Sequence, residues 1–104
     1  MMVSFNDFEK LDLRVGNVKA AEKIQGTKLV KIKVDIGDEL RQLVAGGGLE
    51  PDDLEGKNVV VIANLEPKTL KGVQSNGMIL AADAGGKPII LMPEKDVPAG
   101  TKVS

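Results

Sequence analysis

A strict alternation over residues 30–36, within the stretch LVKIKVDIG at 29–37, constrains the fold of this chain more than any other feature. The apolar members are Val30, Ile32, Val34 and Ile36, and the polar ones between them are Lys31, Lys33 and Asp35. Because successive side chains of a strand point to opposite faces, this pattern predicts a strand with one face in a core. The turn sequence GDE at 37–39 then predicts a hairpin with residues 40–46.

Further strands are expected on both sides of this hairpin. They are DLRVGNVKAAEKI at 12–24, bent at Gly16, then NVVVIANL at 58–65, MILAAD at 78–83, PIILMP at 88–93, and a short extended piece within 95–104. The uninterrupted apolar run at 58–65 is typical of a strand buried on both faces. These segments predict an all-β protein.

Two short helices and one long loop complete the expected elements. SFNDFEKL at 4–11 predicts a helix capped by Ser4, and Pro51–Leu54 predicts a helical turn ended by Gly56. EPKTLKGVQSNG at 66–77 is expected to be a loop. The triple glycine at 46–48 is not followed by Lys-Ser/Thr or directly by a helix, so a Walker phosphate loop is excluded and a connection is expected.

The order of elements points to one particular all-β architecture. Three strands, a short helix and two more strands are typical of the OB-fold, a five-stranded Greek-key barrel. The 104 residues suffice for one domain, 1–104, with added elements at both ends. OB-folds bind oligonucleotides on the face of their second and third strands, where Lys31 and Lys33 would stand beside Arg41.

Composition argues for a binding module without chemistry of its own. The chain has no His and no Cys, which removes the commonest metal ligands and the best nucleophile, and its acids lack the spacing of a calcium loop. We therefore expect no catalytic residue, no metal and no cofactor. No apolar run approaches the roughly 18 residues that span a bilayer, and neither a signal peptide nor a disulfide framework is evident, which suits a cytoplasmic protein.

The distribution of charge says more than the net charge of −1. Six basic residues and one acid lie between Arg14 and Lys33, whereas seven acids and only Arg41 lie between Asp35 and Glu55. This asymmetry fits a basic patch on a nearly neutral molecule, and it also fits an ordinary solvated face. Charge alone leaves both interpretations open.

The stretch QSNGM at 74–78 is a small polar cluster before an apolar run. As a turn, Asn76-Gly77 would supply positive φ, Ser75 would bond neighbouring backbone, and Met78 would begin a buried strand. As a surface, it would lie beside the flexible donors Lys68 and Lys71. The sequence allows either reading.

The only aromatic residues are Phe5 and Phe8. Proteins that bind single strands without sequence preference stack bases on aromatic side chains, and no expected barrel strand offers one. If the chain binds nucleic acid, it should read phosphates and shape in a structured molecule. The two phenylalanines are expected to anchor the N-terminal helix on its own barrel or across a dimer.

Taken together, four segments resemble the tRNA-binding domain family. They are DLRVGNV, KLVKIKVDIGDELRQLVAG, LEGKNVVVIANLEPKTLKGVQSNGMILAA and LMPEKDVPAGTKVS, and the specific part is the pattern NLxPxxLxGxxSxGMxLAA. The likeness runs from about Phe5 to Ser104 and is greatest to the C-terminal domain or beta subunit of methionyl-tRNA synthetase. The chain departs from the family in EKIQGTKL, where many members have a His-Pro-x-Ala-Asp-Lys-Leu stretch, and in its shorter GGGLEPDD loop.

The resemblance implies an OB-fold core, tRNA recognition by shape, and a homodimer built from the terminal extensions, about 1–11 and 88–104. Carried onto this sequence, the expected tRNA-binding residues are Lys31, Lys33, Arg41, Asn64, Lys68, Lys71, Ser75 and Met78. The expected dimer contacts are Phe5, Phe8, Leu91 and Met92.

The expected function is to raise the tRNA affinity of a methionyl-tRNA synthetase, with tRNA, a second copy and the synthetase catalytic subunit as partners. Two alternatives stay open. One is a dimeric chaperone-like module that binds extended peptides in the same groove. The other is a pure dimerisation domain without RNA contact.

Overall fold

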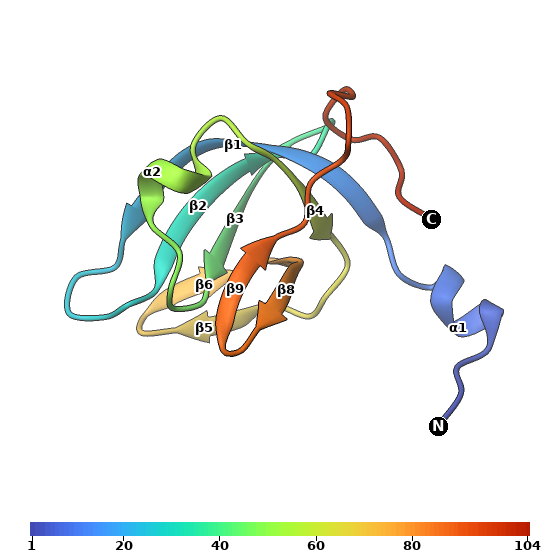
Figure 1. The fold of residues 1–104 in the computed structure, drawn as a ribbon, viewed down its shortest axis with the longest axis horizontal. Helices are drawn as coiled ribbons and strands as arrows, with labels where there is room; N and C mark the ends of the chain where they lie inside the picture. The colour runs from blue at the N-terminus through green and yellow to red at the C-terminus, as the bar shows by residue number, and fades with distance from the viewer.

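The computed structural model describes residues 1–104 and shows a nearly closed antiparallel barrel (Figure 1). Its five strands are β1 (Leu13–Lys23), β2 (Val30–Asp35), β3 (Leu40–Ala45), β4 (Asn58–Ile62) and β7 (Met78–Ile79). They follow the order β3-β2-β1-β4-β7, so that β1 lies in the centre and the open seam lies between β3 and β7. The all-β class and the five-stranded OB-type barrel expected from the sequence are confirmed.

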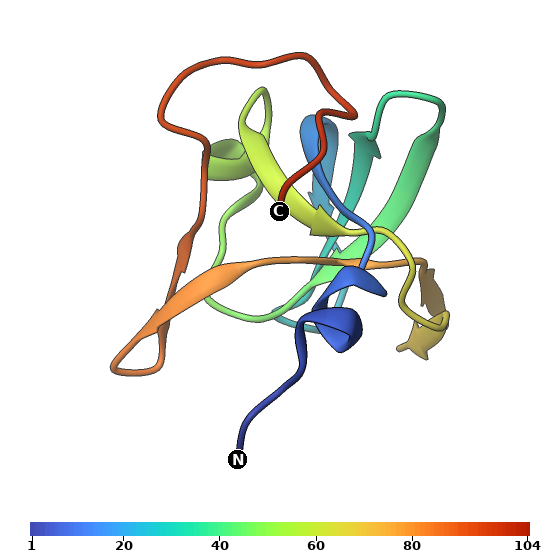
Figure 2. The ribbon, with the colours of Figure 1, turned by 90° about the vertical axis from the view of Figure 1, so that its right-hand side faces the viewer.

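Two helices and two hairpins are added to the barrel. They are α1 (Phe5–Glu9), α2 (Pro51–Leu54), β5 (Lys68–Leu70) with β6 (Val73–Ser75), and β8 (Ala81–Ala84) with β9 (Lys87–Ile90). Turning the molecule by 90° shows that α1 and the β8–β9 hairpin project from the barrel (Figure 2). Neither helix has the length and apolar character that crossing a bilayer requires.

The β5–β6 hairpin corrects one expectation, because residues 66–77 were predicted to be a loop. Leu70 pairs with Val73, which leaves a two-residue turn at Lys71 and Gly72. Both turn residues have positive φ, 50° and 79°. Such turns are usually signalled by Asn-Gly or Asp-Gly. Lys-Gly carries no such signal, so the sequence pattern did not reveal the hairpin.

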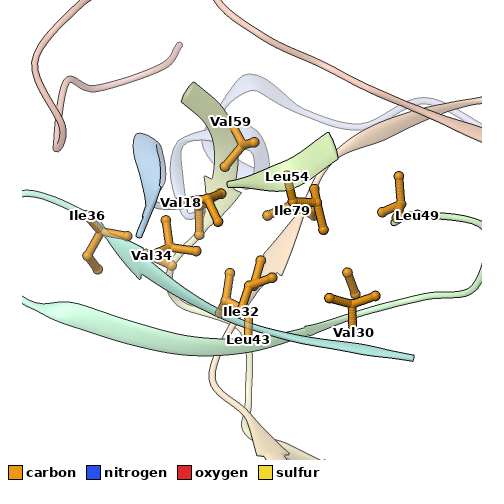
Figure 3. Close-up of a cluster of buried hydrophobic side chains, with 13 residues drawn as sticks. Val18, Val30, Ile32, Val34, Ile36, Leu43, Leu49, Leu54, Val59 and Ile79 are labelled. Atoms are coloured by element: carbon orange, nitrogen blue, oxygen red, sulfur yellow. The ribbon is translucent and has the colours of Figure 1, made fainter. Parts of the chain in front are cut away.

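The predicted alternation in β2 forms the core. Val30, Ile32 and Val34 are fully buried, and Leu54 of α2 closes one end of the barrel. Figure 3 shows side chains from β1, β2, β3, β4, α2 and β7 around one interior. The predicted buried face of β2 is thereby confirmed.

β1 is long enough to pair with two neighbouring strands. Its first half, Leu13–Asn17, pairs with β4, and its second half pairs with β2. The register shifts between Val18 and Ala20, so the irregularity of this strand lies at Lys19 and not at Gly16, where a bend was expected. Gly16 instead allows close packing, since a Cβ atom there would collide with Cγ1 of Val34.

The C-terminal segment covers the edge of β1 that β2 leaves open. The amide of Val15 donates to the carbonyl of Thr101 at 2.8 Å, the amide of Gly100 donates to the carbonyl of Val15 at 2.7 Å, and the amide of Val103 donates to the carbonyl of Leu13 at 2.9 Å. The short extended piece predicted near the end of the chain is therefore part of the barrel wall.

Candidate functional site

The QSNGM stretch closes the seam of the barrel. The amide of Asn76 donates to the carbonyl of Gln42 at 2.9 Å, and the amide of Val44 donates to Oγ of Ser75 at 2.9 Å. The Ser75 hydroxyl in turn donates to the carbonyl of Gly77 at 3.0 Å and is only 5% exposed. A side-chain hydroxyl thus takes the place of a missing backbone pair between β3 and β7.

Gly77 shows why this stretch needs glycine. Its φ is 139°, and a Cβ atom would lie 2.7 Å from the carbonyl oxygen of Ile62 and 3.0 Å from Cδ2 of Leu43. The positive φ predicted for the Asn-Gly pair is confirmed at Gly77, whereas the φ of Asn76 is not positive. The stretch is therefore a turn that holds the barrel closed, and the residues around it in the folded chain form the candidate binding surface.

Arg41 does not stand beside Lys31 and Lys33 as the sequence suggested. The turn after β2 takes four residues, 36–39, because Asp35 pairs with Leu40. This register places Arg41 opposite Val34, on the inner side of β3. A shift of one residue moves every side chain of a strand to its other face, and the expected three-residue turn was one residue too short.

From this position Arg41 spans the end of the barrel. Its Nη1 donates to the carbonyls of Ala63 at 2.7 Å and of Asn76 at 2.9 Å, while Nε donates to Oε1 of Glu39 at 2.5 Å. Nη2 has no hydrogen-bond acceptor in the protein and is not buried. The guanidinium is therefore fixed on one side and open on the other.

A polar groove of about 560 Å³ lies where Lys33 and Gln42, on the outer faces of β2 and β3, meet the guanidinium that Arg41 extends from the inner face, and it reaches β6. It is lined by Lys33, Glu39, Leu40, Arg41, Gln42, Leu65, Pro67, Gln74 and Asn76. Nε2 of Gln42 donates to the carbonyl of Gln74 at 2.9 Å, which ties the groove wall to the β5–β6 hairpin. Ammonium, guanidinium and amide groups of this kind bind phosphate and ribose oxygens.

A second, apolar hollow of about 480 Å³ adjoins the polar groove, and Leu65 lines both. Met78 begins β7 as expected, but it lies in this hollow and is 46% exposed, so its own side chain is not buried. β7 has only two residues, and Ile79 takes the buried position while Met78 faces outward. Lys68 and Leu70 complete this side of the hollow.

The lysines expected to form one basic patch are separated in the structure. Lys31 pairs with Glu22 at 2.7 Å, away from the groove, and its hydrogen bond lowers the pKa of that carboxyl below its usual value. Lys33 lines the groove and has no ion pair. Lys68 lies at the apolar hollow, and Lys71 is exposed in the hairpin turn.

Asn64 lies in neither hollow and instead fastens the segment after α1. Its Nδ2 donates to the carbonyl of Lys10 at 2.6 Å, and its Oδ1 accepts from the amide of Asp12 at 2.8 Å. Nη2 of Arg14 donates to the Asp12 carboxylate at 2.8 Å, and this bond lowers the pKa of Asp12. The connection between α1 and the barrel is therefore fixed at several points.

The residues expected in a dimer interface are exposed apolar side chains. Phe5 and Phe8 are 70% and 38% exposed, with ring centroids 6.3 Å apart, and no residue of α1 is buried. Leu91 and Met92, just after β9, are 44% and 54% exposed. The exposure of Phe5 argues against the alternative in which the two phenylalanines anchor α1 on its own barrel.

Sequence reasoning missed several residues of the polar groove, above all Gln42, Gln74 and Glu39. Gln42 pairs with Lys33, so the correct hairpin register would have placed it. Gln74 could not be found without the β5–β6 hairpin. Nothing in the sequence marked Glu39 as a site residue, because acidic residues are common in turns.

These features define a small OB-type barrel with a polar groove over its second and third strands, where OB-folds bind oligonucleotides. A family model described as "Putative tRNA binding domain" matches residues 13–102. The chain belongs to the tRNA-binding domain family, and the resemblance seen in its sequence is confirmed.

Similar proteins come from archaea and bacteria. Methionine–tRNA ligase of Archaeoglobus fulgidus is 53% identical over 97% of this chain, and that of Thermococcus kodakarensis is 51% identical over 97%. The chain spans only 16% and 14% of their lengths. Among solved structures, the MetRS-related protein of Pyrococcus horikoshii is 39% identical with a TM-score of 0.94, covering 100% of this chain and 99% of the other. The chaperone CsaA of Bacillus anthracis is 31% identical with a TM-score of 0.89, and each chain is covered completely.

Proposed function

We propose that this domain binds folded tRNA by shape through the polar groove over β2 and β3 and does no chemistry of its own. The observation that carries the proposal is the place of this groove, on the oligonucleotide-binding strands of an OB-type barrel, in a chain of the tRNA-binding domain family. Such a role belongs in the cytoplasm, where tRNA is charged.

Lys33 and the open side of Arg41 would neutralise backbone phosphates, and the amides of Gln42 and Gln74 would bond ribose or phosphate oxygens. No aromatic side chain lines the groove, so bases have no ring to stack on and shape must supply the selectivity. Of the other expected residues, Lys68, Lys71 and Met78 lie where a long RNA could reach beyond the groove. Lys31, Asn64 and Ser75 already serve internal contacts, and we give them supporting roles.

The test is to titrate the domain into a labelled folded tRNA and into an unstructured RNA of equal length over a salt series. We expect tighter binding of the folded molecule, with the logarithm of affinity falling by about 0.7 to 0.9 per neutralised phosphate for each tenfold rise in salt. Lys33→Glu should weaken binding, whereas Lys19→Glu, the same charge change at an exposed position outside both hollows and both terminal extensions, should not. An affinity that is independent of salt would exclude this mechanism.

We further propose that the domain raises the tRNA affinity of a methionyl-tRNA synthetase. The support is that the chain is 53% identical to a segment of such a ligase. Joining the domain to the catalytic body should lower KM for tRNA more than it changes kcat, because only binding is improved. If Lys33→Glu in the joined protein leaves charging kinetics untouched, the domain is a pure dimerisation unit.

We also propose that two copies associate through the terminal extensions, 1–11 and 88–104. Phe5, Phe8, Leu91 and Met92 offer the exposed apolar side chains for this contact, whereas residues 100–103 are already bonded to β1. Dimerisation would raise the apparent affinity for tRNA by bringing two grooves to one molecule. Sedimentation should show a dimer at micromolar concentration, and Phe5→Ser should shift it toward monomer. A monomeric wild-type protein would refute this part.

A second candidate function is the binding of extended peptides, and the apolar hollow beside the groove favours it. Leu65, Leu70 and Met78 offer it aliphatic and thioether surface, and a chaperone, CsaA, has nearly the same fold. The domain would then suppress aggregation of a denatured protein in a light-scattering assay, and Met78→Ser should abolish the effect. Unchanged aggregation would exclude this function.

A further inference from the structure

A carboxylate lies inside the polar groove that is proposed to bind a polyanion. Glu39 lines the groove, and its Oε1 accepts from Nε of Arg41 at 2.5 Å. The Glu39 side chain is about half exposed, whereas that of Arg41 is mostly covered. The pair therefore consists of a movable anion on the turn before β3 and a cation that is held in place.

If the Glu39 side chain moves away, the guanidinium of Arg41 stays in place. Nη1 is committed to two backbone carbonyls, those of Ala63 and Asn76, which belong to the end of β4 and to the seam before β7. The remaining donors are Nε, which Glu39 occupies, and Nη2, which has no acceptor in the protein. These two nitrogens form one edge of the guanidinium, and such an edge binds a phosphate through two parallel hydrogen bonds.

We propose that Glu39 is a built-in competitor for phosphate at this edge, and so a residue that decides which ligands occupy the groove at a given concentration. A phosphodiester gains both hydrogen bonds only when it displaces the carboxylate. The inference rests on the proposed binding of tRNA in this groove and names the residue that sets how tightly a ligand must bind to occupy it.

The competition lowers the affinity of every ligand that displaces Glu39 by the same factor, so at a fixed concentration a weak ligand leaves the groove empty while a strong ligand still occupies it. An exposed ion pair is worth little by itself, so a ligand that also contacts Lys33 and the groove amides can displace Glu39. An unstructured RNA must order its backbone to reach the same groups and has less binding energy to offset the lost pair and the repulsion between two anions. Glu39 therefore widens the difference in occupancy between a folded RNA and a flexible one at a fixed RNA concentration, while the ratio of their affinities stays the same.

The test compares Glu39→Gln and Glu39→Ala with Asp52→Asn. Asp52 lies in the first turn of α2, outside both hollows and without a hydrogen bond, so Asp52→Asn changes the net charge equally. Affinities for a folded tRNA and an unstructured RNA of equal length are measured at several salt concentrations. Urea unfolding of each variant verifies that the barrel is intact.

Both Glu39 variants should bind unstructured RNA and folded tRNA several-fold more tightly than the wild type does, by about the same factor, so that unstructured RNA occupies the groove at a lower concentration. Glu39→Ala should gain at least as much as Glu39→Gln, because glutamine still offers an oxygen to Nε. Asp52→Asn should change neither affinity by more than about twofold, since distant exposed charges are screened. Equal gains for Asp52→Asn and the Glu39 variants, or no gain, would overturn the proposal.

The two proposals fail in different ways. If Lys33→Glu does not weaken tRNA binding, the groove is not the RNA site and the proposed function fails. If Lys33→Glu weakens binding but removal of the Glu39 carboxylate does not strengthen it, only the competitor role fails.

Discussion

Single residues at the seam show how a β-barrel closes where its strands do not pair. Ser75 accepts from the amide of Val44 and donates to the carbonyl of Gly77, so one hydroxyl satisfies two buried backbone groups. Buried polar groups cost free energy when they lose their partner. This side chain therefore contributes to stability, although sequence alone left open whether it belonged to a ligand surface.

Ser75→Ala is expected to lower the free energy of unfolding by about 1–3 kcal/mol, because the amide of Val44 is left buried without an acceptor. Urea unfolding followed by circular dichroism measures the change. The control is Thr69→Ala, an exposed position on β5, where a change within about 0.5 kcal/mol is expected. If Ser75→Ala is as stable as the wild type, the seam is closed by other contacts.

Asp12 makes stability depend on pH in the acid range. The hydrogen bond from Arg14 lowers the pKa of Asp12 below its ordinary value of 3.8. Its contribution is therefore fully present above pH 3.8 and is lost as the pH falls through the lower folded-state pKa. Asp12→Asn should be less stable than the wild type at pH 7, and the difference in unfolding free energy should shrink toward pH 2. A difference that stays constant with pH would contradict this origin.

At the scale of elements, β1 and β2 approach so closely that a side chain at one position does not fit. A Cβ atom at Gly16 would meet Cγ1 of Val34, and Cγ2 of Val61 at 3.1 Å. Both neighbours are β-branched residues whose rotamers are stiff. The glycine is thus part of the packing of the core, and the strand remains regular there.

Gly16→Ala should destabilise the domain by about 1–3 kcal/mol, as overpacking of a core does. Gly46→Ala is the matched control, because a Cβ atom there meets nothing within 4 Å and its φ is not positive. Thermal or urea unfolding compares the two variants. Equal stability of both would mean that Val34 moves aside without cost.

The connection between α1 and the barrel depends on Asn64. Asn64→Ala should leave the amide of Asp12 without its acceptor and raise the rate of hydrogen exchange over residues 10–12, while the exchange of β2 stays unchanged. Asn6→Ala on α1, whose side chain makes no hydrogen bond in the structure, should change neither. Unaltered exchange at Asp12 in Asn64→Ala would show that the connection is held by Arg14 alone.

At the scale of the whole molecule, the sequence predicted what depends on local periodicity and missed what depends on register. The alternation at 30–36, the cap at Ser4, the proline at the start of α2 and the order of strands were enough for the barrel. The side of Arg41 depended on whether a turn has three or four residues, which no periodicity reveals. The seam joins residues 42–44 to residues 75–77, and only the folded chain brings them together.

The residues of the candidate site were likewise predicted only in part. Lys33 was placed correctly by the strand pattern, and the family pattern pointed to Ser75 and Asn64, whose hydrogen bonds turned out to be internal. The resemblance thus identified the region, and the contacts separated groups that hold the barrel from groups that face the groove. Glu39 could be assigned to the groove only from the structure, through the hydrogen bond that it accepts from Arg41.

The segment from Gly100 to Val103 lies against the first half of β1. The first strand of the barrel is therefore completed by residues that lie more than 80 positions later in the sequence. During synthesis, the edge of residues 13–15 that faces away from β4 therefore stays unpaired until residues 100–103 have left the ribosome. Contacts between distant parts of a sequence slow folding, and an open strand edge invites pairing with other chains. The nascent domain is thus most exposed to aggregation in the interval before its last residues return to its first strand.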